Sequence, residues 1–202
     1  MMYYSASMNT LDESLMNAVK EGKLLESSRT NIRLLLDGTE SPIAREAVEE
    51  LAAAGEWQEL NDRFYKTLAF GTGGLRGRTI GSIVTRAEQG NGGVNGRPEY
   101  PCVGTACMNY FNVGRAMRGL IIYVNKHVEA TDPGRKPRLV IGHDTRHFSR
   151  DFAEFCAKIG TDLGCDIYLF DSPRATPEIS FAIRELHADS GVVLTASHNH
   201  QG

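Results

Sequence analysis

The sequence predicts an α/β fold: a three-layer α/β/α domain with a mainly parallel sheet, preceded by an N-terminal helical arm. Short apolar runs at 139–141, 167–170 and 192–194 have the length of buried strands, and an amphipathic helical pattern separates each from the next. Strand, helix, strand, helix, strand is the order of parallel βαβ units. We therefore divide the chain into an arm, 1–65, packed on a main domain, 66–202.

The arm carries the apolar spacing of amphipathic helices. One helix is expected over 10–22 and a second over 41–55, where Ser41 provides a cap and Pro42 occupies the first helical position. A short third helix is expected over 57–65. Because the arm has few large apolar residues, we expect it to pack against the main domain and not to form a core of its own.

The middle of the chain is less regular. A weak strand is expected at 79–84, and the segment 90–98 holds too many glycines to pack in a core. The longest helix is expected over 105–128, where apolar residues recur at the helical period. In the regular part that follows, Ser149 is expected to cap one helix and Thr176 to start the other.

Composition argues against several classes of function. The 202 residues carry a net charge of −3, which gives no reason to expect nucleic acid or an anionic membrane as a partner. No apolar stretch reaches the roughly 20 residues of a membrane span, and the N-terminus lacks the basic and apolar parts of a secretory signal. Four cysteines without a CxxC pair suit a reducing compartment, so the predicted location is the cytoplasm.

The predicted topology gathers polar loops on one side of the sheet. The loops 144–146, 172–174 and 197–199 each follow a predicted parallel strand. In open α/β sheets the ligand binds beyond the carboxyl ends of the strands, so a site is expected at this edge.

The third of these loops carries the sequence TASHN at 195–199. Ala196 leaves room for a substrate beside the hydroxyl of Ser197, and His198 and Asn199 add polar groups. The alternative for this loop is a hydroxyl that only caps a following helix.

A second motif, FGTGGLRG, occupies 70–77. Its small residues, with Thr72 and Gly73 among them, let backbone amides approach an anion, and Arg76 adds a guanidinium that can grip a phosphate at two points. The glycine spacing is neither that of a Walker loop nor GxGxxG. The alternative is a glycine turn with a surface arginine.

The loop after the first strand contains Asp144 and Arg146. Either the two side chains pair and brace the loop, or Arg146 faces a bound phosphate. Both interpretations remain open from the sequence.

Histidines raise a further alternative, a metallohydrolase. The residues concerned are His143, His147, His198 and His200, with Asp144 nearby, and zinc favours such ligands. Their spacing does not place them on one helical face. A serine hydrolase is disfavoured because GxSxG is absent.

Four segments in this order resemble the α-D-phosphohexomutases, the phosphoglucomutase and phosphomannomutase superfamily: FGTGGLRG, HDTRHFS, TPEISFAIRELHADSGVV and TASHN. The resemblance covers roughly residues 66–199 and is closest to the bacterial phosphoglucomutase branch with phosphopentomutase-like members. It implies that 66–202 is domain I of such an enzyme, ending at the phosphoserine loop.

The resemblance also implies roles for the site residues. Ser197 would carry a phosphoryl group, with Arg76 and His198 as further catalytic residues. Thr72, Gly73, Arg146 and Asn199 would bind the substrate or its phosphate. Magnesium would bind the phosphate on Ser197 together with carboxylates of another domain.

The implied activity is an intramolecular phosphotransfer that interconverts a sugar 1-phosphate and a 6-phosphate, or a 5-phosphate for a pentose, through a bisphosphate that also acts as activator. The partners are then a phosphosugar and the remaining domains of the polypeptide. The family's metal loop and sugar loop are missing from this sequence, so the chain alone is expected to be inactive. A non-catalytic sugar-phosphate-binding module is the main alternative function.

Overall fold

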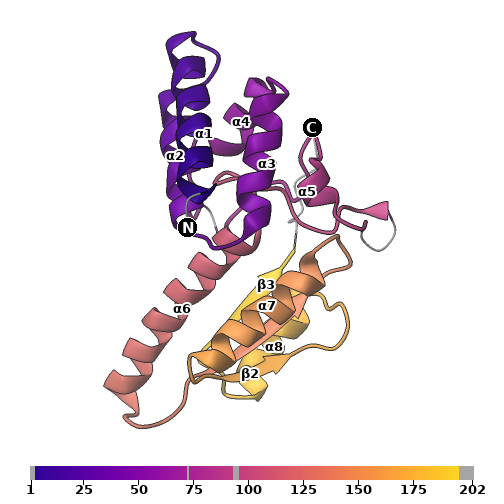
Figure 1. The fold of residues 1–202 in the computed structure, drawn as a ribbon. Helices are drawn as coiled ribbons and strands as arrows, with labels where there is room; N and C mark the ends of the chain where they lie inside the picture. Colours follow the sequence, from indigo (N-terminus) through magenta and orange to yellow (C-terminus); the bar gives the residue numbers. More distant parts are fainter. Residues whose placement is uncertain (1–2, 72, 93–95, 196–202) are drawn as a thin grey trace. The chain divides into compact units, whose positions relative to one another are not determined.

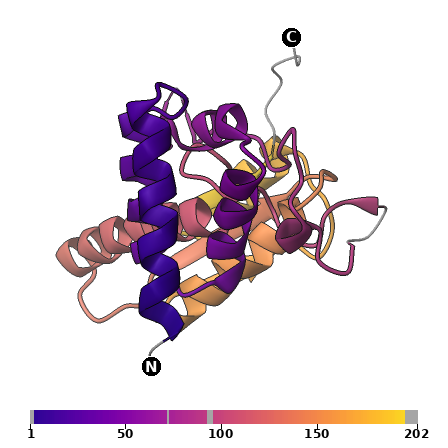
Figure 2. The ribbon, with the colours of Figure 1, turned by 45° about the horizontal axis from the view of Figure 1, so that its top comes forward.

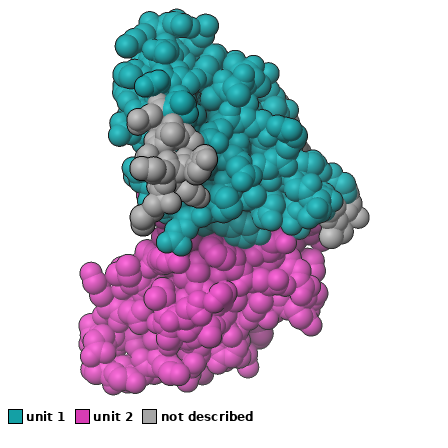
Figure 3. All heavy atoms as spheres, in the orientation of Figure 1, with its two compact units in different colours: residues 1–111 teal, residues 112–202 magenta. Residues whose placement is uncertain are grey.

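A computed structural model describes residues 3–71, 73–92 and 96–195, with side chains from residue 10 onward (Figure 1, turned in Figure 2). Contacts between residues group the chain into two compact units, 1–111 and 112–202, coloured separately in Figure 3. Each unit is described by itself below. The division into an arm and a main domain at residue 65 stays a prediction.

Helices dominate the first unit. The structure contains α1 (Tyr3–Lys20), α2 (Glu26–Asp37), α3 (Pro42–Ala53), α4 (Trp57–Phe64) and the single-turn α5 (Arg86–Gln89). The expected starts of α3 and α4 are confirmed. The expected start of the first helix at residue 10 is wrong, since α1 begins at Tyr3, and α2 and α5 were not predicted.

These helices share one hydrophobic core, so the expectation that the arm lacks the apolar residues for a core is wrong. Ile32, Val48, Leu60 and Phe64 are fully buried at its centre, and Val103 joins it from a later segment. Small residues take part as well, since Ala44 and Ala47 of α3 are buried in the cluster. The full cluster is Leu11, Leu15, Ala18, Leu24, Ile32, Leu35, Ala44, Ala47, Val48, Leu51, Ala52, Leu60, Phe64 and Val103.

The expected strand at 79–84 is also wrong, because this segment pairs with no strand in the described part of the chain. Its backbone groups bond elsewhere. The carbonyl of Thr79 accepts from the amide of Cys102 at 2.8 Å, and the carbonyl of Ile83 accepts from the guanidinium of Arg63. These bonds satisfy the backbone one group at a time and leave no ladder for a sheet.

A buried guanidinium holds this part of the first unit together. Arg63, on α4, has no exposed surface and donates to Glu59 at 2.8 Å, to both carboxylate oxygens of Glu88 and to the carbonyl of Val103 at 3.3 Å. Glu88 in turn closes a capping box with Thr85 at the start of α5. Burial alone would lower the pKa of Arg63, but nearby Cys102, Glu88 and Glu59 raise it above its usual value, so the charge is retained.

The second unit confirms the predicted α/β order. The long helix α6 (Tyr110–Thr131) spans the boundary between the units, and β1 (Arg138–His143), α7 (Ser149–Asp162), β2 (Asp166–Leu169), α8 (Thr176–Glu185) and β3 (Ser190–Leu194) follow it. The strands are parallel, in the order β2-β1-β3. Helix α6 begins five residues later than expected, because 105–109 form turns.

Helices α7 and α8 cover opposite faces of this sheet (Figures 1 and 2). Ile167 of β2 packs on Gly160 of α7, and it pairs in register with Leu139 of β1. Three residues further along β1, and therefore on the other face, Gly142 packs on Ile179 of α8. The predicted α/β/α layering is thus confirmed. No helix among the described residues has the length and apolar character that crossing a membrane requires.

The carboxylate of Asp189 fixes the alignment of β1 and β3 at their amino ends. It accepts from Arg135 at 2.7 and 3.0 Å and from the backbone amide of Arg138 at 2.8 Å. The hydrogen bonds from Arg135 lower the pKa of Asp189, so the carboxylate stays charged. A slip of one residue between these strands would break all three bonds and turn the apolar side chains to the wrong face.

A substitution at Gly142 tests how closely α8 approaches the sheet. A Cβ there would overlap the side chain of Ile179, so we expect Gly142→Ala to lower the free energy of unfolding by about 1–3 kcal/mol. Gly119→Ala in α6 is the matched control. No described atom lies within 4 Å of a Cβ built there, and alanine should stabilise by about 0.5–1 kcal/mol. Urea unfolding measures both, and equal effects would contradict the close approach.

A second prediction concerns the buried Arg63. Arg63→Met keeps most of the volume but leaves the buried Glu88 without its cation and Glu59 with Arg78 alone, so we expect a loss of roughly 3–5 kcal/mol. Lys23→Met, which removes the exposed pair with Glu21, should cost less than about 1 kcal/mol. Denaturant unfolding compares the two. A loss at Arg63 no larger than at Lys23 would show that the network adds nothing to stability.

Candidate functional site

The parallel sheet brings the ends of its strands to one edge. β1 ends at His143, β2 at Leu169 and β3 at Leu194. The amide of Asp144 donates to the carbonyl of Leu194 at 3.1 Å, and the amide of Arg174 donates to the carbonyl of His143 at 3.1 Å. These backbone hydrogen bonds join the ends of β1 and β3 and attach the loop after β2 to the end of β1.

The catalytic loop predicted after β3 lies mostly outside the described residues. Thr195 is described and exposed. Ser197, His198 and Asn199 lie outside the described residues, as does Thr72 of the FGTGGLRG segment. Their assignment rests on the sequence.

Asp144 braces the loop after β1. One of its carboxylate oxygens accepts from the hydroxyl of Ser149 at 2.6 Å and from the amide of Arg146 at 3.0 Å. Ser149 is therefore not the helix cap that the sequence predicted: Phe148, in the left-handed region at φ 67°, precedes α7, and the hydroxyl of Ser149 is turned to Asp144.

The guanidinium of Arg146 is only loosely paired. Its Nε lies 3.7 Å from Asp144, and 55% of its side chain is exposed. The two interpretations of this loop are thus compatible, since the backbone amide of Arg146 takes part in the brace while its guanidinium faces solvent.

A further arginine at this edge, Arg174, was not among the predicted site residues. Its guanidinium lies over the ring of Phe170, 5.7 Å from the centroid, and 3.4 Å from Glu178. The sequence could have indicated Arg174, because it lies in the loop that follows a predicted parallel strand. Arg174 and Arg146 give the edge two cationic side chains.

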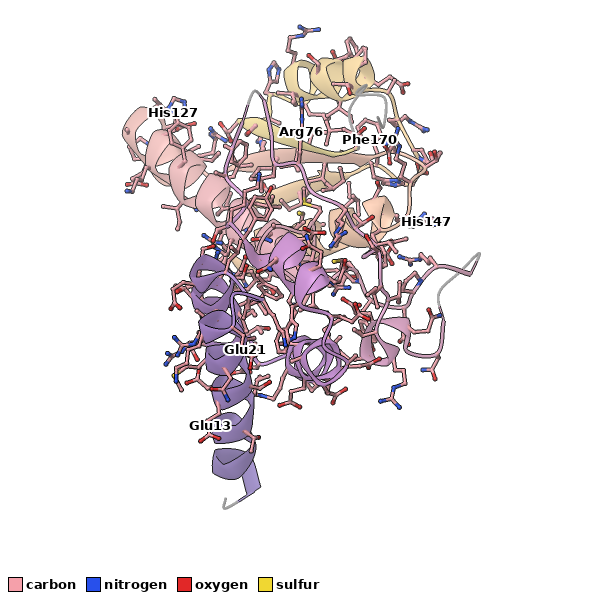
Figure 4. All side chains as sticks on the ribbon, turned by 90° about the horizontal axis from the view of Figure 1, so that it is seen from above. Glu13, Glu21, Arg76, His127, His147 and Phe170 are labelled. Carbon is pink, nitrogen blue, oxygen red and sulfur yellow. The ribbon has the colours of Figure 1, made fainter. Side chains whose placement is uncertain are left out.

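The histidines at this edge differ in their surroundings. The ring of His143 is buried, with Nδ1 3.0 Å from the carbonyl oxygen of Asp144, whereas His147 is exposed (Figure 4). His198 and His200 lie outside the described residues. Nowhere in 10–71, 73–92 or 96–195 do three His, Cys, Asp or Glu side chains come together as a metal site.

The FGTGGLRG segment forms a glycine turn in the first unit. The amide of Gly71 donates to the carbonyl of Gly74 at 3.1 Å, and Gly73 adopts a φ of +86°, which side chains rarely allow. Arg76 follows on the surface (Figure 4) and has no hydrogen bond or ion pair to any described residue.

Arg76 lines an open pocket of about 680 Å³ whose wall comes entirely from the first unit. Lys66 and Arg78 line the same pocket, but Arg78 is paired with Glu59 at 2.9 Å. The pocket therefore presents a guanidinium that is free to bind an anion. Gly73 and Arg76 belong to the first unit, and Arg146 belongs to the second.

Residues 88–202, more than half of the chain, match the family model described as phosphoglucomutase/phosphomannomutase, alpha/beta/alpha domain I. The chain belongs to this family. The matched range takes in the whole sheet and the TASHN segment. It begins at Glu88 and so leaves out Gly73 and Arg76.

Curated relatives agree with this membership of the phosphoglucomutase/phosphomannomutase family. A phosphoglucomutase of Staphylococcus epidermidis is 34% identical over 142 residues, which are 70% of this chain and 21% of the relative. A phosphoglucomutase of Staphylococcus aureus is 32% identical over 141 residues, 70% of this chain and 20% of the relative. The chain thus spans about a fifth of the length of these relatives. No solved structure gives a significant match.

Proposed function

We propose that this chain is the first domain of a phosphosugar mutase, which interconverts a sugar 1-phosphate and a 6- or 5-phosphate. Membership of the family and relatives named phosphoglucomutase support the proposal. We propose further that residues 66–202 form this domain and that the remaining domains complete the active site. The isolated chain is then expected to show no turnover.

One observation carries the proposal: the hydrogen bond between the amide of Asp144 and the carbonyl of Leu194. Leu194 stands three residues before Ser197 in the sequence. The bond fixes the start of the serine segment beside a loop that Asp144 braces and that carries the exposed Arg146. The proposal thus assigns a serine and a cation to the loops after adjacent strands, at the edge where α/β sheets bind ligands.

In the proposed reaction, Ser197 begins as a phosphate ester. A free hydroxyl of the sugar monophosphate attacks the phosphorus, the bond from phosphorus to Oγ of Ser197 breaks, and His198 takes part in moving the hydroxyl proton. The product is a sugar bisphosphate. After this bisphosphate reorients, Oγ of Ser197 attacks its other phosphate, which restores the phosphoserine and releases the isomerised monophosphate.

Charge stabilisation is the main demand of such a transfer, because negative charge spreads over the oxygens of the moving phosphoryl group. We assign Arg76 to this role with the amides around Thr72 and Gly73, and Arg146 and Asn199 to binding the phosphate or sugar. The exposed guanidinium of Arg76 supports the assignment, since it forms no ion pair with a carboxylate of the described residues. When bound, magnesium would add charge stabilisation, and its carboxylate ligands are proposed to come from other domains.

Replacement of Ser197 tests the central step. In the full-length enzyme, we expect Ser197→Ala to abolish incorporation of labelled phosphate from glucose 1,6-bisphosphate and to change stability by no more than about 0.5 kcal/mol. Ser180→Ala is the matched control, because it removes an exposed hydroxyl from α8, outside the loops of the proposed site. The control should label normally. Labelling of the Ser197→Ala protein would place the phosphoryl group elsewhere.

Arg76 is tested by a substitution that keeps its charge. Lysine lacks the planar, two-pronged donor of arginine, so Arg76→Lys should slow phosphoserine formation by roughly a hundredfold while the melting temperature is unchanged. The matched control is Arg86→Lys, at a side chain in the same unit that is 93% exposed. A lower melting temperature with a normal rate of phosphorylation would make Arg76 a structural residue.

A further inference from the structure

Two cysteines of the first unit lie in direct contact. The Sγ atoms of Cys102 and Cys107 are 2.9 Å apart, and both residues are buried. A disulfide bond needs a separation of about 2.05 Å, so only a small movement separates this pair from a bridge. The contact does not depend on any residue assigned to phosphoryl transfer.

The backbone around the pair is held in the shape that brings the two sulfurs together. The side-chain amide of Asn109 donates to the carbonyl of Cys102 at 2.9 Å and to that of Gly104 at 2.8 Å. The amide of Cys107 donates to the carbonyl of Gly104 at 3.4 Å, which closes the turn between the cysteines. The loop therefore does not have to rearrange before a bond can form.

Positive charge beside the pair favours a reactive thiolate. The hydrogen bond from Cys102 lowers the pKa of Cys107, and the guanidinium groups of Arg63 and Arg78 lower it further against the effect of burial. The pKa of Cys102 is raised by the same hydrogen bond, which favours Cys107 as the thiolate of the pair. At Cys156, by contrast, burial raises the pKa of the thiol to about 12.

Cys107 is buried directly behind two residues that line an open pocket. Arg78, which contacts the sulfur of Cys107, and Ala106, the preceding residue, both line the open pocket that contains Arg76. A hydroperoxide is little larger than water and needs to pass only this layer. The segment 76–79 is also joined to the cysteine loop, because the amide of Met108 donates to the carbonyl of Arg78 at 2.9 Å.

We propose that Cys102 and Cys107 form a reversible redox site, oxidised by a hydroperoxide to an internal disulfide. The Cys107 thiolate attacks one peroxide oxygen, the oxygen–oxygen bond breaks, and a sulfenic acid forms on Cys107. The other oxygen takes up a proton from solvent, which replaces the one that Cys107 released on ionising, and leaves as water or alcohol. The sulfur of Cys102 then attacks the sulfur of Cys107, and the expelled hydroxide takes the Cys102 proton to leave as water. Two thiols are oxidised, one peroxide is reduced, and an external dithiol reverses the change.

The test is timed oxidation of the whole chain with hydrogen peroxide, quenching with N-ethylmaleimide and peptide mass analysis. The peptide that spans Cys102 and Cys107 should lose the mass of two hydrogens and regain it with dithiothreitol. Cys107 should be oxidised at least about tenfold faster than Cys156, since one pKa unit changes the thiolate fraction tenfold. Unmodified thiols at both positions, or sulfinic acid without a bridge, would overturn the proposal.

Variants separate the two roles. In Cys102→Ser, the sulfenic acid on Cys107 has no resolving partner and should be trapped by dimedone. Cys107→Ser should leave Cys102 unreactive, and Cys156→Ser, the control in the second unit, should form the bridge at the normal rate. If a variant fails to fold, the timed oxidation of the unmodified chain still decides the question. Rapid oxidation of Cys102 in Cys107→Ser would contradict the assignment of Cys107 as the attacking thiol.

Discussion

The first unit depends on one buried charge. The Arg63 guanidinium reaches four separate stretches of chain: its own helix through Glu59, α5 through Glu88, and the carbonyls of Ile83 and Val103. Placing this charge out of water is costly, and two carboxylates and two carbonyls offset that cost only when all the segments are in place. The network therefore makes the positions of otherwise irregular segments depend on one another.

The sequence predicts the secondary structure of the second unit better than that of the first. In the second unit, apolar strands alternate with amphipathic helices, and local pattern and final fold agree. Helix α2 was missed because its cap, Leu25, provides no side-chain hydrogen bond and polar residues fill its first turns. The strand expected at 79–84 fails for a different reason: the carbonyls of Thr79 and Ile83 accept from Cys102 and Arg63, which are distant in sequence. No local pattern reveals such partners.

The candidate site shows the same limit. Sequence places Asp144 and Arg146 in one loop, but only the structure shows that the carboxylate accepts from Ser149 and from the amide of Arg146. The exposed, unpaired state of Arg76 is also a property of the folded chain, since the neighbouring Arg78 is engaged with Glu59. Arg78 is engaged and Arg76 is available to a ligand because the buried carboxylate of Glu59, on α4, pairs with Arg78.

Gly142 links the distance between α8 and the sheet to the position of the loop that carries Arg174. Its neighbour His143 accepts a hydrogen bond from the amide of Arg174, two residues before α8, and Ile179 of α8 rests on Gly142 itself. Any added volume at residue 142 lifts α8 and, through it, shifts the loop that carries Arg174. Natural variation beneath this helix thus offers evolution a way to retune the cationic edge while every residue that faces the ligand stays the same.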